Sequence, residues 1–256
     1  MTAPGAPEVA RHGSITYARR PGAPPPLLLL HGWGTDSSFM WPVTDQLPGR
    51  HAICPDLPGH GASPNPPAPW GVPEYAAAVA DLARQDAGGG PFDVVAHSFG
   101  ARIGLRLAAS GEVPLRRLLL TGAAGLRAPG ASAKPRASVR MARFAARHGG
   151  TAGEALRERV YERVGSEDYR QAVRDGLRET FVKVVNDDLR DLLGEIRVPV
   201  LLVFGDRDDA TPIERGREMA DAIPDAALVT FEGRGHYAYL DELPRFGAIA
   251  REFLAT

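Results

Sequence analysis

The sequence predicts an α/β fold in which a mostly parallel β-sheet is flanked by helices. Short runs of Leu, Val, Ile and Phe recur along the chain, and longer segments with apolar residues at helical spacing separate most of them. The apolar runs are continuous rather than alternating, which is typical of strands covered on both faces. The length of 256 residues and the hydrophobic content of 44% suffice for one domain with an insertion.

The elements are expected in the following order along the chain. A weak polar/apolar alternation over residues 13–19 favours an antiparallel hairpin at the sheet edge. Strands are predicted at 27–30, 52–54, 92–96, 115–120, 198–204 and 227–231. Helices are predicted where apolar residues recur every three or four positions, at 75–85, 99–110, 212–222 and 243–254.

Residues 125–195 interrupt this alternation, because they contain helix-favouring residues and scattered glycines but no strand-like run. We therefore predict a helical cap over 125–195, inserted into a core domain formed by 1–124 and 196–256. The cap contains arginines at steps of three or four, which lie on one helix face and form either a solvated face or a guide for an acidic partner: Arg136, Arg140, Arg143 and Arg147.

The inner face of the cap is the place where substrate specificity is expected, since such segments vary freely on a fixed scaffold. Ordinary packing between cap helices explains the same large side chains equally well. The candidates for substrate contact are Met141, Tyr161, Tyr169 and Phe181.

Composition excludes several classes of protein. Thirty basic and 31 acidic residues give a net charge of −1, which removes the electrostatic argument for nucleic acid or an anionic membrane as the main partner. The single cysteine, Cys54, permits no intrachain disulfide and no thiolate metal cluster. No apolar run approaches the roughly 20 residues of a membrane span, and the N-terminus lacks a secretory signal. We expect a soluble, cytoplasmic, monomeric protein.

A serine stands at a predicted turn between a strand and a helix. Residues 92–101 read F-D-V-V-A-H-S-F-G-A, which is the pattern of a nucleophile elbow around Ser98. The usual form, G-x-S-x-G, has small residues two positions to each side because the strained turn brings backbone close. Ala96 replaces the first glycine and adds one methyl group. A serine hydroxyl is a weak nucleophile, so a base and an orienting acid must accompany it.

Three histidines adjoin the expected edge of the sheet. His236 follows the last predicted strand in a turn with two glycines, which can carry an imidazole to this edge as the base. His97 precedes Ser98 directly, but on an elbow its side chain points away from the hydroxyl, which favours a structural role. His31 lies in the loop after the first predicted strand and is expected to hold that loop by hydrogen bonds.

The acid is expected after the strand at 198–204, where three aspartates follow in close succession. Asp206 could pair with a neighbouring arginine or cap the turn, and Asp209 could cap the next helix. The residues alone do not separate these two from Asp208. The order Ser, Asp, His along the chain is that of the α/β-hydrolases.

Four segments together resemble the α/β-hydrolase superfamily, and the likeness covers about residues 13–254. In the family's pattern Asp208 is the acid of the triad, so the resemblance implies Ser98, Asp208 and His236 as catalytic residues. The segments are L-L-L-H-G-W-G at 28–34, D-L-P-G-H-G-A-S at 56–63, the elbow at 96–100, and G-x-x-D-x-x-x-P at 205–212 with G-H at 235–236.

The same resemblance implies an oxyanion hole built from two backbone N–H groups. One belongs to Phe99, the residue after the nucleophile, and the other to Trp33 in the loop at 28–34. Their side chains are expected either to pack in the core or to line the acyl pocket, and both roles are compatible.

The activity that the resemblance implies is hydrolysis of a small-molecule carboxylic ester, without cofactor or metal. Ser98 attacks the carbonyl, His236 transfers the proton and Asp208 holds the imidazole. Activity is expected to fall as the base protonates, near the ordinary histidine pKa of about 6.5.

Other functions stay open on this fold. Carbon–carbon bond hydrolysis, lyase and lactonase activities use the same triad, but carbon–carbon hydrolases commonly have H-G-x-G-P-G where Thr35 and Asp36 follow Gly34 here. The loop at 31–34 also looks like that of the methyl esterases acting on pimeloyl carrier protein. A small-molecule binding protein is the third possibility, since some relatives of this fold are receptors with damaged triads.

Overall fold

The computed structural model describes residues 7–127, 150, 151 and 166–255. The described strands form one eight-stranded sheet in the order β1-β2-β4-β3-β5-β6-β7-β8. β1 (Glu8–His12) and β2 (Ile15–Arg20) form an antiparallel hairpin, and β2 pairs antiparallel with β4 (Arg50–Pro55). All other neighbours are parallel, namely β3 (Ala23–Leu30), β5 (Phe92–His97), β6 (Leu115–Thr121), β7 (Val200–Gly205) and β8 (Ala226–Phe231). The predicted α/β fold is confirmed.

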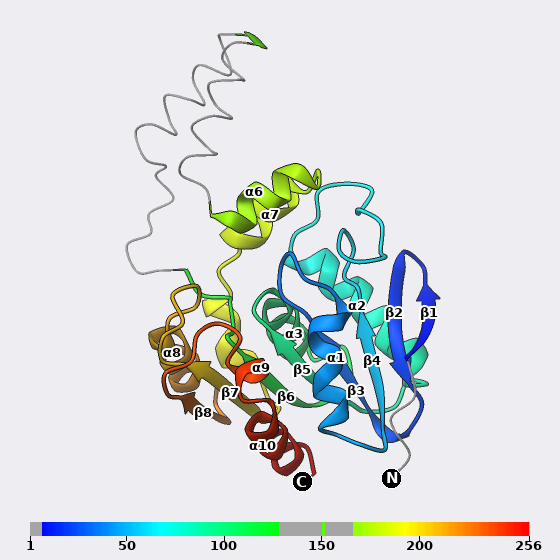
Figure 1. The fold of residues 1–256 in the computed structure, drawn as a ribbon, viewed down its shortest axis with the longest axis vertical. Coiled ribbons are helices and arrows are strands. Elements are labelled where there is room, and N and C mark those ends of the chain that lie inside the picture. Colours follow the sequence, from blue (N-terminus) through cyan, green and yellow to red (C-terminus); the bar gives the residue numbers. More distant parts are fainter. Residues whose placement is uncertain (1–6, 128–149, 152–165, 256) are drawn as a thin grey trace.

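Helices cover both faces of this sheet (Figure 1). One face carries α1 (Ser37–Asp45), α9 (Ala238–Asp241) and α10 (Leu243–Ala255). The other carries α2 (Val72–Asp86), α3 (Phe99–Ser110), α8 (Ile213–Ala222) and the 3₁₀-helix η1 (Arg190–Glu195). None of the described helices is long and apolar enough to cross a membrane.

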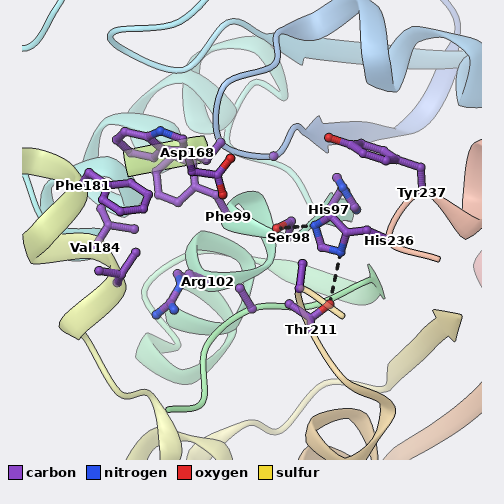
Figure 2. A pocket seen from close by; sticks show the side chains of 15 residues that line it. His97, Ser98, Phe99, Arg102, Asp168, Phe181, Val184, Thr211, His236 and Tyr237 are labelled. Atoms are coloured by element: carbon purple, nitrogen blue, oxygen red, sulfur yellow. Dashed lines mark hydrogen bonds between the residues drawn. The ribbon is translucent and has the colours of Figure 1, made fainter. Parts of the chain in front are cut away.

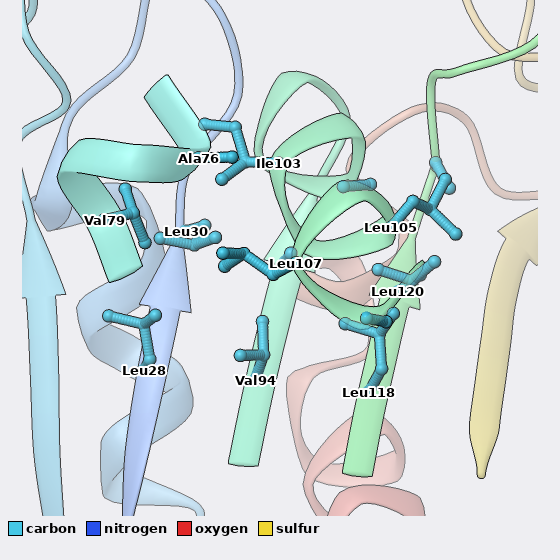
Figure 3. Packing of buried hydrophobic residues seen from close by; sticks show 14 of the residues in the cluster. Leu28, Leu30, Ala76, Val79, Val94, Ile103, Leu105, Leu107, Leu118 and Leu120 are labelled. Atoms are coloured by element: carbon cyan, nitrogen blue, oxygen red, sulfur yellow. The ribbon is translucent and has the colours of Figure 1, made fainter. Parts of the chain in front are cut away.

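The core consists of two apolar layers, one on each side of the sheet. In β3, Leu28 and Leu30 pack toward α2 and α3, whereas Leu27 and Leu29 pack toward α1 and α10. All four leucines are fully buried. Figure 3 shows the first layer, in which Leu28 and Leu30 lie beside residues of β5 and β6. This arrangement explains the continuous apolar runs, because successive side chains of a strand face opposite layers.

Three described elements were not expected from the sequence, and β3 begins earlier than predicted. β1 is short and mostly exposed, so it lacks an apolar pattern. α1 contains Pro42, and α9 has only four residues. β3 begins at Ala23, but its three prolines lack the N–H of a central strand, and pairing with β5 starts only at Leu27.

Helices α6 (Glu167–Arg174) and α7 (Arg178–Asn186) follow β6 and precede β7, inside the segment predicted to be the cap. Met141, Tyr161 and the four arginines at 136–147 lie outside the described residues. The division into a core of 1–124 and 196–256 and a cap of 125–195 stays a prediction.

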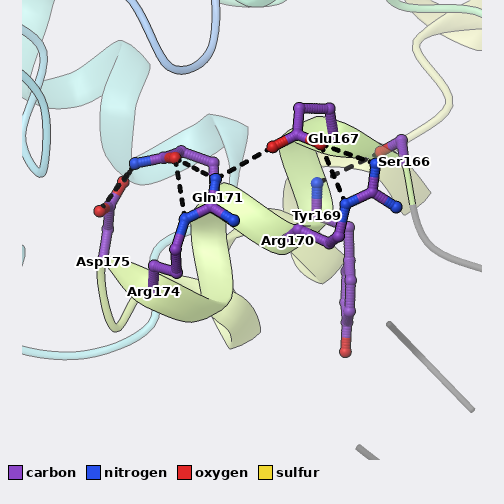
Figure 4. Close-up of polar contacts among 7 residues, drawn as sticks. All are labelled: Ser166, Glu167, Tyr169, Arg170, Gln171, Arg174 and Asp175. Carbon is purple, nitrogen blue, oxygen red and sulfur yellow. Dashed lines mark hydrogen bonds and ion pairs between the residues drawn. The ribbon is translucent and has the colours of Figure 1, made fainter. Parts of the chain in front are cut away.

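Helix α6 has one charged and one buried side. On the charged side, Glu167 forms ion pairs with Arg170 and Arg174 (Figure 4). On the other side, Tyr169 packs against Phe181 of α7, with ring centroids 6.0 Å apart. This amphipathic pattern fixes which face of the α6–α7 pair turns toward the core.

Candidate active site

Ser98 sits at a strained turn between β5 and α3. Its φ of 49° is the only positive value at a non-glycine residue in the described part of the chain. The Ser98 N–H donates to Thr121 O at 3.1 Å, and its carbonyl accepts from Ala124 N at 3.3 Å. Such strain persists only where neighbouring structure holds it, and it is common at catalytic nucleophiles.

The small residues around Ser98 are needed for different reasons. A Cβ on Gly100 would lie 2.5 Å from the carbonyl oxygen of Leu30, so any side chain would push α3 off the sheet. Ala96 is tolerated because it faces Gly104 of α3, where the missing side chain leaves room for one methyl. The departure from G-x-S-x-G is therefore accommodated by a second glycine, one helical turn beyond Gly100.

The side chains of Ser98, His236 and Asp208 form a continuous hydrogen-bonded chain. Figure 2 shows its link between His236 and Ser98. His236 Nε2 lies 2.9 Å from Ser98 Oγ, and His236 Nδ1 lies 2.7 Å from Asp208 Oδ2. The three residues come from the ends of β5, β7 and β8, which meet at one edge of the parallel sheet. In this geometry the hydroxyl can pass its proton to the imidazole as it attacks.

Of the three aspartates after β7, only Asp208 contacts the imidazole in the described structure. Its Oδ1 accepts from the N–H groups of Ala210 and Thr211, and Oδ2 accepts from Thr211 Oγ1 at 2.7 Å. Burial raises the pKa of Asp208, but the hydrogen bonds from His236 and Thr211 outweigh it and hold the pKa below its ordinary value. Asp206 instead accepts the N–H of Gly233, and Asp209 is exposed.

The loop after β3 is held by His31. Leu57 N donates to His31 Nε2 at 2.9 Å, which leaves Nδ1–H to donate to the carbonyl of Gly32 at 2.7 Å. The turn at 56–63 is fastened by Asp56, which accepts from the N–H groups of Ser37 and Ala62. The two motifs therefore brace each other and place residues 32–33 beside the elbow.

His97 lies next to the candidate triad but does not bond to its serine. Its Nδ1–H donates to Thr121 O at 3.0 Å, and its ring centroid lies 4.6 Å from that of His236. The side chain is only 1% exposed. This position matches the structural role that the sequence favoured.

The N–H groups of Trp33 and Phe99 are available for a ligand. Among the residues that the structure describes, neither donates to a hydrogen-bond partner. A Cβ on Gly32 would lie 3.5 Å from the Cβ of Ser98, so the loop runs directly past the elbow. The indole of Trp33 packs on the ring of Phe99 at a centroid distance of 5.2 Å. The predicted role of these two N–H groups in an oxyanion hole stays a prediction.

A cavity of about 380 Å³ opens above Ser98. Trp33, Phe99 and Phe181 form its aromatic wall, and the rings of Trp33 and Phe181 are 5.0 Å apart. Tyr169 packs behind Phe181 and does not contribute to the described wall. Of the four cap residues predicted to contact substrate, Phe181 reaches the cavity, Tyr169 supports it, and the other two lie outside the described residues.

Two charged residues of the cavity wall were missed in the sequence. Arg102 follows Ser98 by four residues, so helical periodicity places both on one side of α3. Asp168 enters from α6, and its carboxylate points into the cavity (Figure 2). The first could have been found from its spacing, whereas the second depends on how α6 packs on the core. No group of three or more metal-ligating side chains occurs among the described residues.

Because two histidines are buried, we expect the folded protein to lose stability in acid. Burial lowers the pKa of His31 and of His97 to about 3, so both stay neutral in the folded protein, whereas the unfolded chain protonates them below about 6.5. The unfolded state then binds more protons, and stability falls as the pH drops through this window. We expect these two groups to lower the free energy of unfolding by about 2 kcal/mol from pH 6 to pH 5 in urea titrations.

A substitution of His12 serves as a control for this prediction, because His12 lies on the edge hairpin and contacts only an exposed carboxylate. The His12→Gln protein keeps both buried imidazoles and is therefore expected to keep the fall in stability between pH 6 and pH 5. A free energy of unfolding that stays constant between pH 6 and pH 5 would contradict the assignment of two buried neutral imidazoles.

The chain is similar in sequence to known hydrolases. The profile of the alpha/beta hydrolase family matches residues 27–247. The chain is 31% identical to a protein of Chromobacterium violaceum named pimeloyl-[acyl-carrier protein] methyl ester esterase, over 92% of this chain and 96% of that protein. A protein of the same name from Neisseria meningitidis serogroup B is 30% identical over 91% of this chain and 94% of its own.

Among solved structures, the thermophilic esterase from Thermogutta terrifontis superposes with a TM-score of 0.71 at 25% identity, covering 94% of this chain and 93% of that one. The family match spans most of the chain and includes the elbow, the aspartate loop and the histidine turn. The chain therefore belongs to the alpha/beta hydrolase family.

Proposed function

We propose that this protein hydrolyses carboxylic esters with Ser98 as nucleophile. The observation that carries the proposal is the hydrogen-bonded chain from Asp208 through His236 to Ser98, which ends at the floor of an open cavity. Relatives named as esterases, at 30% and 31% identity over more than nine-tenths of the chain, support the same reaction.

In the acylation half of the reaction, Ser98 Oγ attacks the ester carbonyl while His236 Nε2 accepts its proton. The carbonyl oxygen gains negative charge, and the N–H groups of Trp33 and Phe99 stabilise it. Losing one such donor typically raises the barrier by about 3 kcal/mol. The tetrahedral intermediate collapses, the imidazolium returns the proton to the alkoxy oxygen, and the alcohol leaves.

In the deacylation half, water replaces the alcohol. His236 Nε2 accepts a proton from the water as its oxygen attacks the acyl-serine carbonyl. Collapse of the second intermediate breaks the bond to Ser98 Oγ, and the proton returns to the serine. The carboxylic acid product then leaves, and Asp208 stays ionised throughout because its pKa is held low.

Hydrolysis of p-nitrophenyl esters with acyl chains from two to twelve carbons tests the proposal. We expect saturable release of p-nitrophenol by the wild-type protein, with a preferred chain length set by the aromatic wall of the cavity. A folded protein that releases no p-nitrophenol above the buffer rate at any chain length would rule out simple ester hydrolysis.

A methyl ester of a carrier-bound acyl chain is a narrower candidate substrate. The relatives from Neisseria and Chromobacterium are named for that reaction and align over 91% and 92% of this chain. Release of methanol from dimethyl pimelate, a neutral mimic of such a chain, tests this narrower form.

The alternatives predict different outcomes in the same assays. A carbon–carbon hydrolase or lactonase would leave p-nitrophenyl esters nearly untouched yet still require Ser98. A binding protein would neither release p-nitrophenol nor react covalently with a serine-directed fluorophosphonate.

A further inference from the structure

Arg102 is an unusual residue to find in an ester-binding cavity. It projects from α3, one turn after Ser98, and lines the cavity although only 8% of its surface is exposed. Burial of a guanidinium is costly unless its charge is compensated and its donors are bonded. The described residues compensate the charge of Arg102 and bond its donors only in part.

The guanidinium has one hydrogen bond in the described structure. Nη1 donates to the backbone carbonyl of Asp187, at the end of α7, at a distance of 2.7 Å. Nε and Nη2 have no hydrogen bond to a described residue. Neither atom is completely buried. A guanidinium carries five N–H donors, so most of those of Arg102 have no partner among the described residues.

The carboxylates nearest to Arg102 do not neutralise it directly. Within the described residues no carboxylate lies within ion-pair distance of the guanidinium. Asp187 and Asp188 act on it only through space, and Asp188 is itself paired with Arg190. Burial lowers the pKa of Arg102 to about 10, so the side chain is still a cation at neutral pH.

The cavity therefore has charges of opposite sign on its two walls. Arg102 lies on the core side, toward Val184, and Asp168 lies on the α6 side, near His236 (Figure 2). The wall between them is aromatic and aliphatic. A substrate with an anionic group would meet attraction at Arg102 and repulsion at Asp168, and this difference orients it.

We propose that Arg102 is a specificity-determining residue that binds a carboxylate carried by the substrate, so that the preferred esters are half-esters of dicarboxylic acids. This inference rests on the proposed esterase function and not on its narrower carrier-bound form, because a carrier-bound acyl chain that ends in a methyl ester has no free carboxylate. A carboxylate accepts two N–H bonds from one edge of a guanidinium, and the desolvated setting strengthens them. The aliphatic chain between the two ends would lie along Phe181 and Val184, which line the cavity beside Arg102.

Matched pairs of substrates test the proposal. Each pair consists of the monomethyl and the dimethyl ester of one dicarboxylic acid, from four to seven carbons, and methanol release gives kcat/KM. The wild-type protein is expected to prefer the half-ester at one or two chain lengths. Arg102→Gln is expected to lower kcat/KM for that half-ester by about 30-fold, mainly through KM, and to change the diester less than about threefold.

Three further variants separate recognition from a structural role. Arg102→Lys keeps the charge and is expected to retain part of the preference. Arg106→Gln makes the same change one turn further along α3, outside the cavity wall, and is expected to leave both substrates unaffected. Asp168→Asn leaves Arg102 intact and is expected to raise kcat/KM for the half-ester about twofold to fivefold by removing a repulsive charge.

Binding without turnover keeps this test independent of the esterase function. Monomethyl glutarate, monomethyl adipate and the free dicarboxylates are titrated calorimetrically into Ser98→Ala protein with and without Arg102→Gln. We expect affinity to fall about 30-fold in the double variant. Equal affinities, or an equal loss of kcat/KM for half-esters and diesters in Arg102→Gln, would overturn the proposal. If the wild-type protein hydrolyses no ester but the Ser98→Ala protein binds these ligands in a way that depends on Arg102, the esterase function is overturned instead.

Discussion

The Ser98→Ala protein is expected to hydrolyse p-nitrophenyl esters at least about 10⁴-fold more slowly than the wild type, with the loss in kcat. Removal of Oγ removes the atom that attacks the carbonyl, and among the described residues His236 has no other hydroxyl within hydrogen-bond distance except Thr211 Oγ1, on its Nδ1 side. Initial rates with the preferred acyl chain give the comparison. The fold should persist, because alanine accepts the same backbone conformation with one atom fewer.

Ser110→Ala is a matched control for this experiment, because Ser110 ends the same helix and is exposed. Its hydroxyl bonds only to backbone groups at the end of the helix, donating to the carbonyl of Leu107 and accepting from the N–H of Glu112. The rate of this variant is expected to stay within twofold of wild type. Residual activity of more than about 1% in Ser98→Ala would show that another group performs the chemistry.

The Asp208→Asn protein is expected to lose about 10³- to 10⁴-fold in kcat. The amide oxygen of the new side chain would keep the N–H groups of Ala210 and Thr211, which turns the amide NH₂ toward His236 Nδ1. The imidazole must then accept at Nδ1 and carry its proton on Nε2. In that tautomer it cannot take the proton of Ser98.

Asp209→Asn and Asp206→Asn are the controls that separate the three neighbouring aspartates. Asp209 is exposed, so its variant is expected to match the wild type. Asp206 accepts the N–H of Gly233 in the turn before His236, a bond that an asparagine oxygen can also accept, so its variant is expected to keep kcat close to that of the wild type. A loss in Asp209→Asn as large as that in Asp208→Asn would contradict the assigned acid.

The sequence predicts the core of the fold because the parallel strands are buried on both faces. Continuous apolar runs such as 27–30 and 115–120 indicate this burial in the sequence. β1 and α1 carry no such signal, since β1 is mostly exposed and α1 has a proline inside it. The prolines in the first half of β3 conceal the strand pattern in the sequence. β3 pairs with its neighbours largely through its second half.

The candidate site could be predicted in its residue types but only partly in its contacts. The elbow, the histidine turn and the aspartate loop stand out because each follows a strand. In the sequence only the family pattern distinguishes Asp208 from its neighbours, since the deciding hydrogen bonds with Thr211 and His236 depend on the folded loop. Asp168 reaches the cavity through packing of α6 on the core, which no local pattern specifies.

Covalent labelling tests most directly whether Ser98 is an activated nucleophile. The folded wild-type protein is treated with a fluorophosphonate at pH 8, and its mass and modified peptide are determined. We predict one added phosphonyl group on Ser98, absent from Ser98→Ala and strongly slowed in Asp208→Asn. A folded protein that remains unmodified, or is modified elsewhere at the same rate in Ser98→Ala, would contradict the assignment of Ser98 as the nucleophile.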